Sequence, residues 1–139
     1  MKKYELTNES ITTDTGILLF RIKCIIDIPS IGIRVGDKGG FIESCDNLSD
    51  NAWVFGDARV CGNARVSDIS DYIVFKNWWS SGRYFTWTRS NNKWVVGCFY
   101  GTGDELIKKA YKDSDKSGQE YEHIVKYVNS IISNNLLRL

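Results

Sequence analysis

Hydrophobic and polar residues alternate along residues 16–28, where Arg21 and Lys23 separate apolar positions. A period of two with many β-branched side chains is typical of a strand that has one buried face. The alternation returns over residues 31–35, after a Pro-Ser break. Three glycines within residues 36–40 then predict a tight turn, because glycine adopts positive φ angles without strain. The first quarter of the chain is therefore predicted to form strands that end in a turn.

A period of six replaces the period of two in residues 36–70. Hexads that begin at Ala52, Ala58 and Ala64 share the order Ala, any residue, Val, and two of them close with Gly-Asp or Gly-Asn. The branched residues that recur every six positions are Ile42, Leu48, Val54, Val60 and Val66. This repeat is typical of a β-helix whose turns have three short flat faces. We predict a short left-handed β-helix-like coil here.

The predicted coil is short for a repeat fold. Its five hexads make fewer than two turns, whereas roughly three or more repeats are needed before neighbouring turns bury a continuous core. The coil must therefore be covered by the flanking strands or by the same coil in other subunits. We expect a homo-oligomer with this coil near an interface.

Aromatic residues dominate the next region. Residues 71–75, 84–88 and 94–100 have high β-propensity and predict three antiparallel strands. Residues 77–82 and 90–93 are rich in Asn and Ser and lie at the spacing of hairpin connections. This region is therefore predicted to be a small antiparallel sheet.

Two capping boxes predict helices in the last region. The Thr102 and Glu105 side chains are spaced to hydrogen-bond opposite ends of a first helical turn. Ser117 and Glu120 repeat this spacing ahead of apolar residues at intervals of three and four. The stripe predicts a second helix of about four turns, which follows a connecting loop over residues 113–116.

Together these patterns predict an α+β fold: a short left-handed β-helix-like coil and antiparallel strands followed by two C-terminal helices. We expect one domain over residues 1–139, because this length suits a single sizeable core. Its parts are the N-terminal strands (1–35), the hexapeptide coil (36–70), the aromatic antiparallel strands (71–101) and the helices (102–139).

Composition restricts the chemistry. The chain has one histidine, His123, and its four cysteines are too widely spaced in sequence for a zinc motif. Because histidine serves most acid and base schemes, we expect no enzyme, catalytic residue, metal or cofactor. Apolar runs are shorter than a signal peptide or a membrane span requires. We therefore expect a cytosolic protein with reduced thiols and with neither a membrane nor a DNA partner.

The net charge of +1 hides an uneven distribution. Residues 72–103 contain ten of the 18 aromatic residues and four basic residues but no acidic residue. Rings stack on nucleobases and guanidinium groups bind phosphates, so the segment suits a ligand that carries both. The candidate ligand-binding residues in it are Phe75, Trp78, Trp79, Arg83, Phe85, Trp87, Arg89, Asn92 and Tyr100.

Strand alternation alone offers another interpretation of these rings. About half of them point into a core whatever the function is, and an oligomer interface explains others. Trp78 and Trp79 are the strongest indication of a binding surface, because a strand core does not accommodate two adjacent loop rings. Both interpretations stay open at this point.

The hexads suggest a second site. Arg59 and Arg65 are six residues apart and occupy equivalent positions in successive hexads. Around a three-fold axis they would form a positive ring suited to an anion, with Gly62 and Asn63 between them. The alternative, favoured by position alone, is that both arginines are solvated outward residues.

Two blocks of the chain resemble bacteriophage proteins. Residues 36–44 and 51–60 are similar to the opening of the short hexapeptide β-helix proteins that are common in phage genomes. Residues 94–102, followed by Glu120 and Tyr121, resemble a block that accompanies this coil. Together they resemble the first-described Thoeris anti-defence family, phage proteins that sequester cyclic ADP-ribose signals.

The resemblance implies a non-catalytic sponge in the host cytoplasm. It would enclose glycocyclic ADP-ribose made by a host TIR-domain enzyme, as a dimer-based assembly or a hexamer, and so block Thoeris defence. Cyclic di- or trinucleotides of CBASS-type defence would occupy a separate site around trimer contacts. Gln119 stands where the resemblance leads us to expect Arg. The phosphate contact then falls to Arg83, Arg89, Lys108 or Lys109.

Two other functions remain as alternatives. A phage structural or assembly protein would use the coil to trimerise and the rings as core. A hexapeptide acyltransferase needs many more hexads and a histidine at a subunit cleft, whereas His123 lies beyond the coil. The acyltransferase is therefore the weakest of the three.

Overall fold

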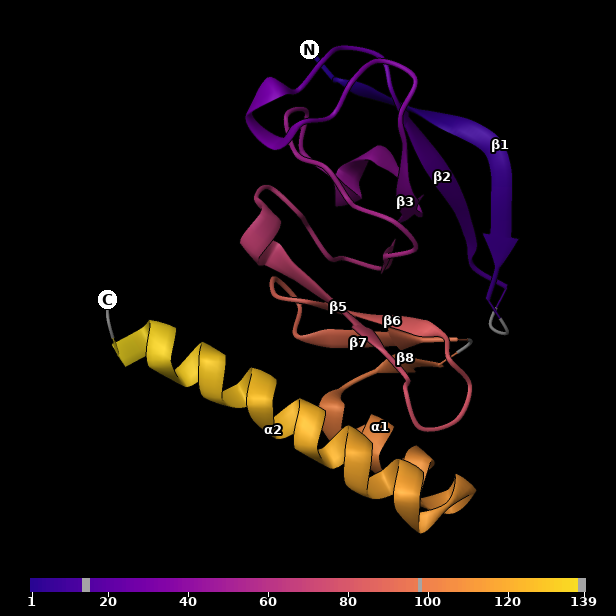
Figure 1. Ribbon diagram of the computed structural model, residues 1–139, viewed down its shortest axis with the longest axis vertical. Helices are drawn as coiled ribbons and strands as arrows, with labels where there is room; N and C mark the ends of the chain where they lie inside the picture. Colours follow the sequence, from indigo (N-terminus) through magenta and orange to yellow (C-terminus); the bar gives the residue numbers. More distant parts are fainter. Residues whose placement is uncertain (14–15, 98, 138–139) are drawn as a thin grey trace.

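The computed structural model describes residues 1–13, 16–97 and 99–137 and has an α+β fold (Figure 1). Two four-stranded sheets are followed by two helices, which confirms the predicted α+β class and the two C-terminal helices. The first sheet has the order β1 (Tyr4–Thr12), β2 (Leu18–Cys24), β3 (Lys38–Ile42) and β4 (Arg59–Val60). The second has the order β5 (Tyr72–Lys76), β6 (Tyr84–Thr88), β7 (Lys93–Val96) and β8 (Phe99–Gly101).

The six-residue repeat produces stacked turns of chain. β3 pairs with β4 in parallel, with Ile42 opposite Val60, and Leu48 forms a parallel bridge with Val66. Each pair is 18 residues apart, which is three hexads. The chain therefore completes one turn and returns beside itself. Fewer than two turns do not make a repeating series, so the left-handed β-helix is not confirmed.

The inward positions of the repeat were predicted correctly. All five branched residues of the six-residue column are buried, as are the alanines that begin the hexads. Gly39 and Gly40 were predicted to lie in a turn and instead belong to β3. A Cβ on Gly40 would lie 2.5 Å from the Ala58 carbonyl oxygen, so glycine is required for the close approach of the next turn.

Two N-terminal predictions need correction. Residues 31–35 do not form a strand, because Pro29–Ile31 is a short 3₁₀ helix (η1) and only a single bridge joins Ile28 to Ile33. Proline fixes φ and favours such a turn. β1 was not located, because Tyr4 is its only buried residue and the strand lacks an alternating pattern. Two further 3₁₀ helices lie in the first half of the coil, Cys45–Asn47 (η2), and at its end, Ile69–Asp71 (η3).

The second sheet is an antiparallel meander. β5 and β6 were predicted nearly to the residue, but the single strand predicted over residues 94–100 is wrong. It is a hairpin of β7 and β8, and Gly97 turns the chain with a φ of 55°. Positive φ suits glycine because it has no Cβ.

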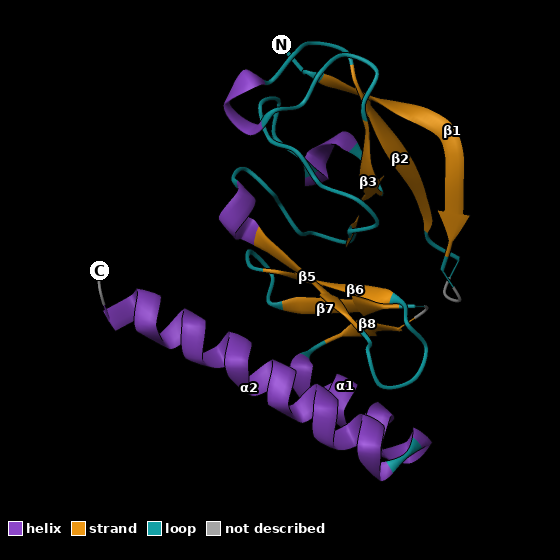
Figure 2. Ribbon diagram, in the orientation of Figure 1, coloured by secondary structure: helices purple, strands orange, loops and turns teal. Residues whose placement is uncertain are grey.

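Two helices cover the face of the second sheet that points away from the coil (Figure 2). α1 (Gly103–Asp113) begins at the predicted Thr102 capping box. The second predicted capping box is wrong, because α2 (Asp115–Leu137) already begins before Ser117. The Ser114 hydroxyl oxygen instead accepts the Ser117 N–H at 3.0 Å, so almost no loop separates the helices. None of the helices in the described part of the chain is long and apolar enough to cross a membrane.

The two sheets pack against each other through the last turn of the coil. The backbone N–H groups of Arg59 and Arg65 donate to Thr86 Oγ1 at 2.9 Å and to Ser90 Oγ at 2.7 Å. A small buried cluster at this junction comprises Leu19, Phe41, Cys61 and Val95. Coil and second sheet therefore form a continuous structure.

Candidate functional site

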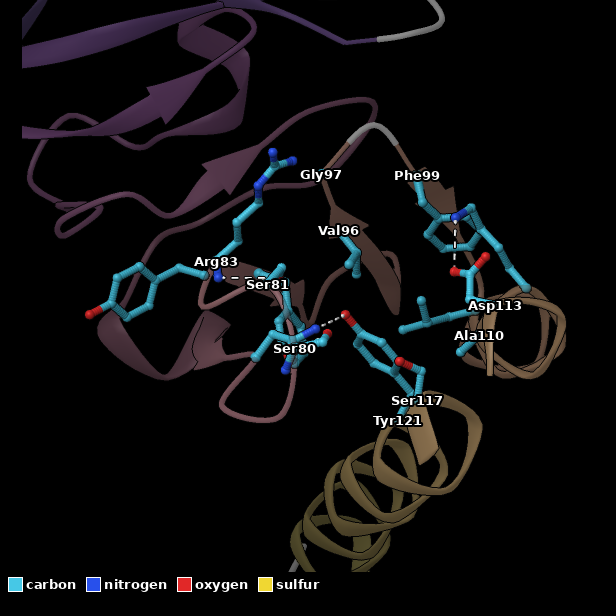
Figure 3. A pocket seen from close by; sticks show the side chains of 15 residues that line it. Ser80, Ser81, Arg83, Val96, Gly97, Phe99, Ala110, Asp113, Ser117 and Tyr121 are labelled. Atoms are coloured by element: carbon cyan, nitrogen blue, oxygen red, sulfur yellow. Dashed lines mark hydrogen bonds and ion pairs between the residues drawn. The ribbon is translucent and has the colours of Figure 1, made fainter. Parts of the chain in front are cut away.

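A cavity of about 270 Å³ lies between the β5–β6 loop, the β7–β8 hairpin and the two helices (Figure 3). We call it the aromatic cavity. Its lining combines four aromatic rings, several neutral hydrogen-bonding side chains and three charged ones. The lining residues are Asn77, Ser80, Ser81, Arg83, Tyr84, Phe85, Val96, Gly97, Phe99, Leu106, Lys109, Ala110, Asp113, Ser117 and Tyr121.

Tyr121 forms the inner wall of the aromatic cavity. Its ring meets Trp79 edge to face at 4.9 Å and Phe85 at 5.2 Å between centroids, and its hydroxyl oxygen accepts a hydrogen bond from Asn77 Nδ2 at 3.3 Å. Burial raises the pKa of Tyr121 above its ordinary value, so the phenol stays neutral. The wall therefore offers an uncharged ring and a hydroxyl group.

Asn77 organises the loop on the other side. It is buried, and its Oδ1 accepts the Ser80 backbone N–H at 2.9 Å and the Ser80 hydroxyl at 3.1 Å. Trp79 Nε1 donates to Ser117 Oγ at 3.0 Å, which ties the loop to α2. These bonds fix the loop that forms this wall of the cavity.

The charged lining residues are not equivalent. Lys109 Nζ lies 3.8 Å from Asp113 Oδ2 on the next turn of α1, so a carboxylate partly compensates its charge. The Arg83 guanidinium has no hydrogen-bond or ion-pair partner among the described residues. Figure 3 shows it directed away from Tyr121 and Ser117, on the side of Gly97. Arg83 therefore supplies an uncompensated cation at the cavity's border.

A second hollow of about 480 Å³ lies on that side of Arg83, between the two sheets. We call it the arginine hollow. Its lining contains Arg21 and Arg59 from the first sheet, and it shares Arg83, Tyr84 and Gly97 with the aromatic cavity. The remaining lining residues are Ile11, Phe41, Asp57 and Gly82. The two hollows are thus neighbours with one common wall.

Three of the predicted ligand-binding residues, Arg83, Phe85 and Lys109, line the aromatic cavity. Phe75 packs behind Phe85, with ring centroids 5.6 Å apart. Trp87 is 1% exposed and donates from Nε1 to Asn92 Oδ1 at 2.8 Å.

Arg89 and Tyr100 lie elsewhere. Arg89 borders a separate groove against α2, and the Tyr100 hydroxyl oxygen accepts from Asn91 Nδ2 at 3.2 Å beside the coil. The structure therefore does not gather these predicted residues into one site.

The adjacent tryptophans, which were predicted to mark a binding surface, have different surroundings. Trp79 packs against Tyr121 in the second core, whereas Trp78 is 65% exposed with Lys116 Nζ 5.1 Å from its ring centroid. Neither ring lines the aromatic cavity. Trp79 supports its inner wall, and Trp78 lies on the surface nearby.

The predicted second site is divided. Arg59 lines the arginine hollow, but the Arg65 backbone is bonded to Ser90, and Asn63 accepts from Asn91 at 3.1 Å. Gly62 N–H donates to Glu43 Oε1 at 2.8 Å. Within one protomer, Arg59 therefore lines the same hollow as Arg83, which was predicted to belong to the aromatic ligand-binding site.

Sequence reasoning missed several lining residues. Asn77, Phe99, Ser117 and Tyr121 come from separate elements, and no local spacing links them. Tyr121 appeared in the resemblance of residues 94–102 and 120–121, but it was not predicted to bind a ligand. Arg21 appeared as an outward residue of an alternating strand, and only the return of the coil beside β3 brings it near Arg59.

The described residues contain no group of three or more His, Cys, Asp or Glu side chains that could hold a metal ion. His123 is exposed on α2 and lines neither hollow. No protein-family model, curated protein or solved structure matches the chain.

Proposed function

We propose that the protein is a non-catalytic nucleotide-binding protein. The observation that carries this proposal is the aromatic cavity, where Phe85, Phe99 and Tyr121 face neutral hydrogen-bonding groups and an unpaired Arg83 stands at the border. Rings and amide or hydroxyl groups suit a nucleobase and a ribose, and a guanidinium group suits a phosphate. Small-molecule sites typically measure about 300–1,000 Å³, and the cavity of about 270 Å³ is close to the lower end of this range.

The ligand we propose is glycocyclic ADP-ribose, which combines an adenine, riboses and a pyrophosphate. This choice rests on the resemblance of residues 36–44, 51–60, 94–102 and 120–121 to the Thoeris anti-defence sponges. Sequestration in the cytoplasm of an infected host would keep the signal from its effector. Binding of cyclic di- or trinucleotides by an oligomer, dimeric or hexameric, is a further part of the same proposal.

The titratable groups that line the aromatic cavity favour binding of the nucleotide without a chemical reaction. They are Lys109 paired with Asp113, Arg83, and the tyrosines, of which Tyr121 has a raised pKa. This set contains no group ordinarily poised to exchange a proton near pH 7. We therefore expect reversible binding and release of an intact ligand.

Calorimetry with glycocyclic ADP-ribose, followed by heat denaturation and chromatography of the released ligand, tests this function. We expect saturable binding and recovery of the unchanged nucleotide. Phe99→Ala, which removes a cavity ring, should weaken binding by about tenfold or more, because base stacking contributes about 1–3 kcal/mol per ring. Tyr127→Ala removes an exposed ring of α2 outside the lining and is the matched control. A cleaved product would show an enzyme instead.

The second candidate is a phage structural or assembly protein that oligomerises through the coil. Burial of Phe85, Trp87 and Trp94 in the second core favours it, because these rings already have a structural role. A thermal-shift screen with ADP-ribose and cyclic dinucleotides separates the two functions. A ligand at 100 times its Kd adds about 2.7 kcal/mol of stability, whereas a structural protein should show no shift with any nucleotide.

A further inference from the structure

We propose that the arginine hollow is a separate binding site for anions that carry two or more phosphate groups. Its three guanidinium groups come from parts of the chain that are far apart: Arg21 from β2, Arg59 from β4 and Arg83 from the residue before β6. No local sequence pattern requires them to meet. The hollow shares Arg83, Tyr84 and Gly97 with the aromatic cavity. The inference nevertheless goes beyond nucleotide binding there, because an anion that carries no base tests it.

Arg21 is held in a fixed position at the floor of the hollow. Its Nε donates to Glu9 Oε2 at 2.6 Å, its Nη1 to the Gly39 carbonyl at 2.6 Å, and its Nη2 lies 3.3 Å from Asp57 Oδ1. The guanidinium carbon lies 4.3 Å from the centroid of the Phe41 ring. A fixed guanidinium loses little conformational entropy when it binds an anion.

Arg59 lies in the same cross-strand row of the first sheet as Arg21. Arg59 and Arg83, which comes from the side of the second sheet, both lie beside Gly97. Arg59 Nη1 donates to the Gly97 carbonyl at 3.3 Å, and a Cβ built on Gly97 would lie 4.0 Å from Arg83 Nη1. The Arg83 guanidinium has no partner among the described residues, and the guanidinium of Arg59 has this single hydrogen bond. A guanidinium group carries five N–H donors, so most donors of this pair are available.

The charge balance of the hollow favours an anion. The lining contains three arginines and one carboxylate, Asp57, which already faces Arg21. Glu9 holds Arg21 from outside the lining and is itself 3.6 Å from Lys38 Nζ. Arg59 and Arg83 therefore keep charges that no described carboxylate compensates.

Chemistry and size indicate a polyphosphate. Guanidinium groups bind phosphate oxygens bidentately. Arg59 and Arg83 supply the two uncompensated guanidinium groups, and a hollow of about 480 Å³ leaves room for more than one phosphate group. Tyr84 is 51% exposed and lines the same hollow, so a ring attached to the phosphates would find a partner there. The shared chemistry is a diphosphate, whether free or part of a nucleotide.

Titration calorimetry with inorganic pyrophosphate tests the site. We expect saturable binding that weakens as salt increases, as it does for phosphate contacts. Arg59→Gln and Arg83→Gln should each raise the pyrophosphate Kd by about tenfold or more, because a hydrogen bond to a charged group contributes about 1.5–3 kcal/mol. Arg34→Gln removes the same charge from an exposed position outside the lining and is the matched control.

Three further measurements distinguish a free diphosphate from a nucleotide as the ligand, and the anion site from nucleotide binding in the aromatic cavity. ADP should bind in competition with pyrophosphate, whereas adenosine should not displace it. Phe99→Ala should leave the pyrophosphate Kd within about twofold, because Phe99 lines only the aromatic cavity. Arg59→Lys keeps the charge but loses the bidentate fork, so it should bind more tightly than Arg59→Gln and more weakly than the parent protein. Only variants whose melting temperature equals that of the parent protein are compared, so that a loss of binding does not come from unfolding.

The outcomes separate cleanly. Absence of pyrophosphate binding, or an equal loss in Arg34→Gln and Arg59→Gln, would overturn the anion site. If glycocyclic ADP-ribose binds and Arg59→Gln has no effect on any phosphate ligand, the anion site is wrong and nucleotide binding stands. If pyrophosphate binds and no nucleotide enters the aromatic cavity, the anion site stands and the proposed function fails.

Discussion

The hydrophobic cores of the first sheet with its coil and of the second sheet with its helices differ in residue type. The first sheet and coil enclose a core dominated by branched aliphatic residues and alanines, with two buried glycines where neighbouring turns approach closely. The second sheet and helices enclose a core of large rings, including Phe85, Trp87, Trp94 and Tyr121. In a repeat, the position within the hexad fixes the direction of each side chain, so the sequence identifies which residues are buried. The number of rings does not identify them, because the same ring can pack in a core or contact a ligand.

Replacement of a core ring should give the largest effect. Trp87→Ala should destabilise the protein by about 3–5 kcal/mol, because the ring is 1% exposed and its removal leaves a cavity. The loss of its hydrogen bond to Asn92 adds to this effect. Urea unfolding followed by circular dichroism measures the change. A loss below about 1 kcal/mol would show that this ring is not part of a packed core.

A methyl group added to the coil should have the next largest effect. Gly40→Ala should cost about 1–3 kcal/mol by overpacking, because its Cβ would lie 2.5 Å from the Ala58 carbonyl oxygen and 2.7 Å from a Val54 methyl. Thermal unfolding measures it, with the exposed Ser70→Ala as control. Equal melting temperatures for the two variants would contradict the close stacking of the turns.

The junction between the halves can be tested by pH. Burial, with a contribution from Glu43, raises the pKa of the Cys61 thiol to about 11 from an ordinary value of 9.0. The unfolded thiol ionises first, so its contribution to stability is complete below pH 9 and is lost as pH rises towards 11. Stability should fall by about 1 kcal/mol more between pH 8 and pH 10 in the parent protein than in Cys61→Ala.

Urea unfolding at both pH values measures this difference. Identical pH dependence in the two proteins would show that solvent reaches the thiol at the junction. The coil would then not pack tightly on the second sheet.

The smallest effect is expected at the exposed ring. Trp78→Ala should change stability by about 0.5 kcal/mol or less, because the side chain is 65% exposed and contacts Trp79 only edge to face. Differential scanning fluorimetry of Trp78→Ala, with Trp87→Ala measured in parallel, compares the loss of stability in the two variants. A loss as large as that of Trp87→Ala would place Trp78 in a core, at odds with its surface position.

Local rules located many of the elements. Alternation located β2, β5 and β6, and the Thr102 capping box located the start of α1. The same rules misplaced the start of α2, because Ser114 and Ser117 are both suitable caps and packing selected the earlier one. They also merged β7 with β8, since one glycine between apolar residues did not stand out as a turn.

The sequence by itself determined the α+β class, the inward column of the repeat and the concentration of rings and positive charge in residues 72–103. Tertiary structure alone decided which rings became core and which charges met. Burial depends on what packs over a strand from a distant element, as α2 does over Phe85 through Tyr121. Arg21, Arg59 and Arg83 become neighbours only when the coil returns beside β3 and the second sheet packs against it. Such proximity is set by long-range contacts that no local spacing encodes.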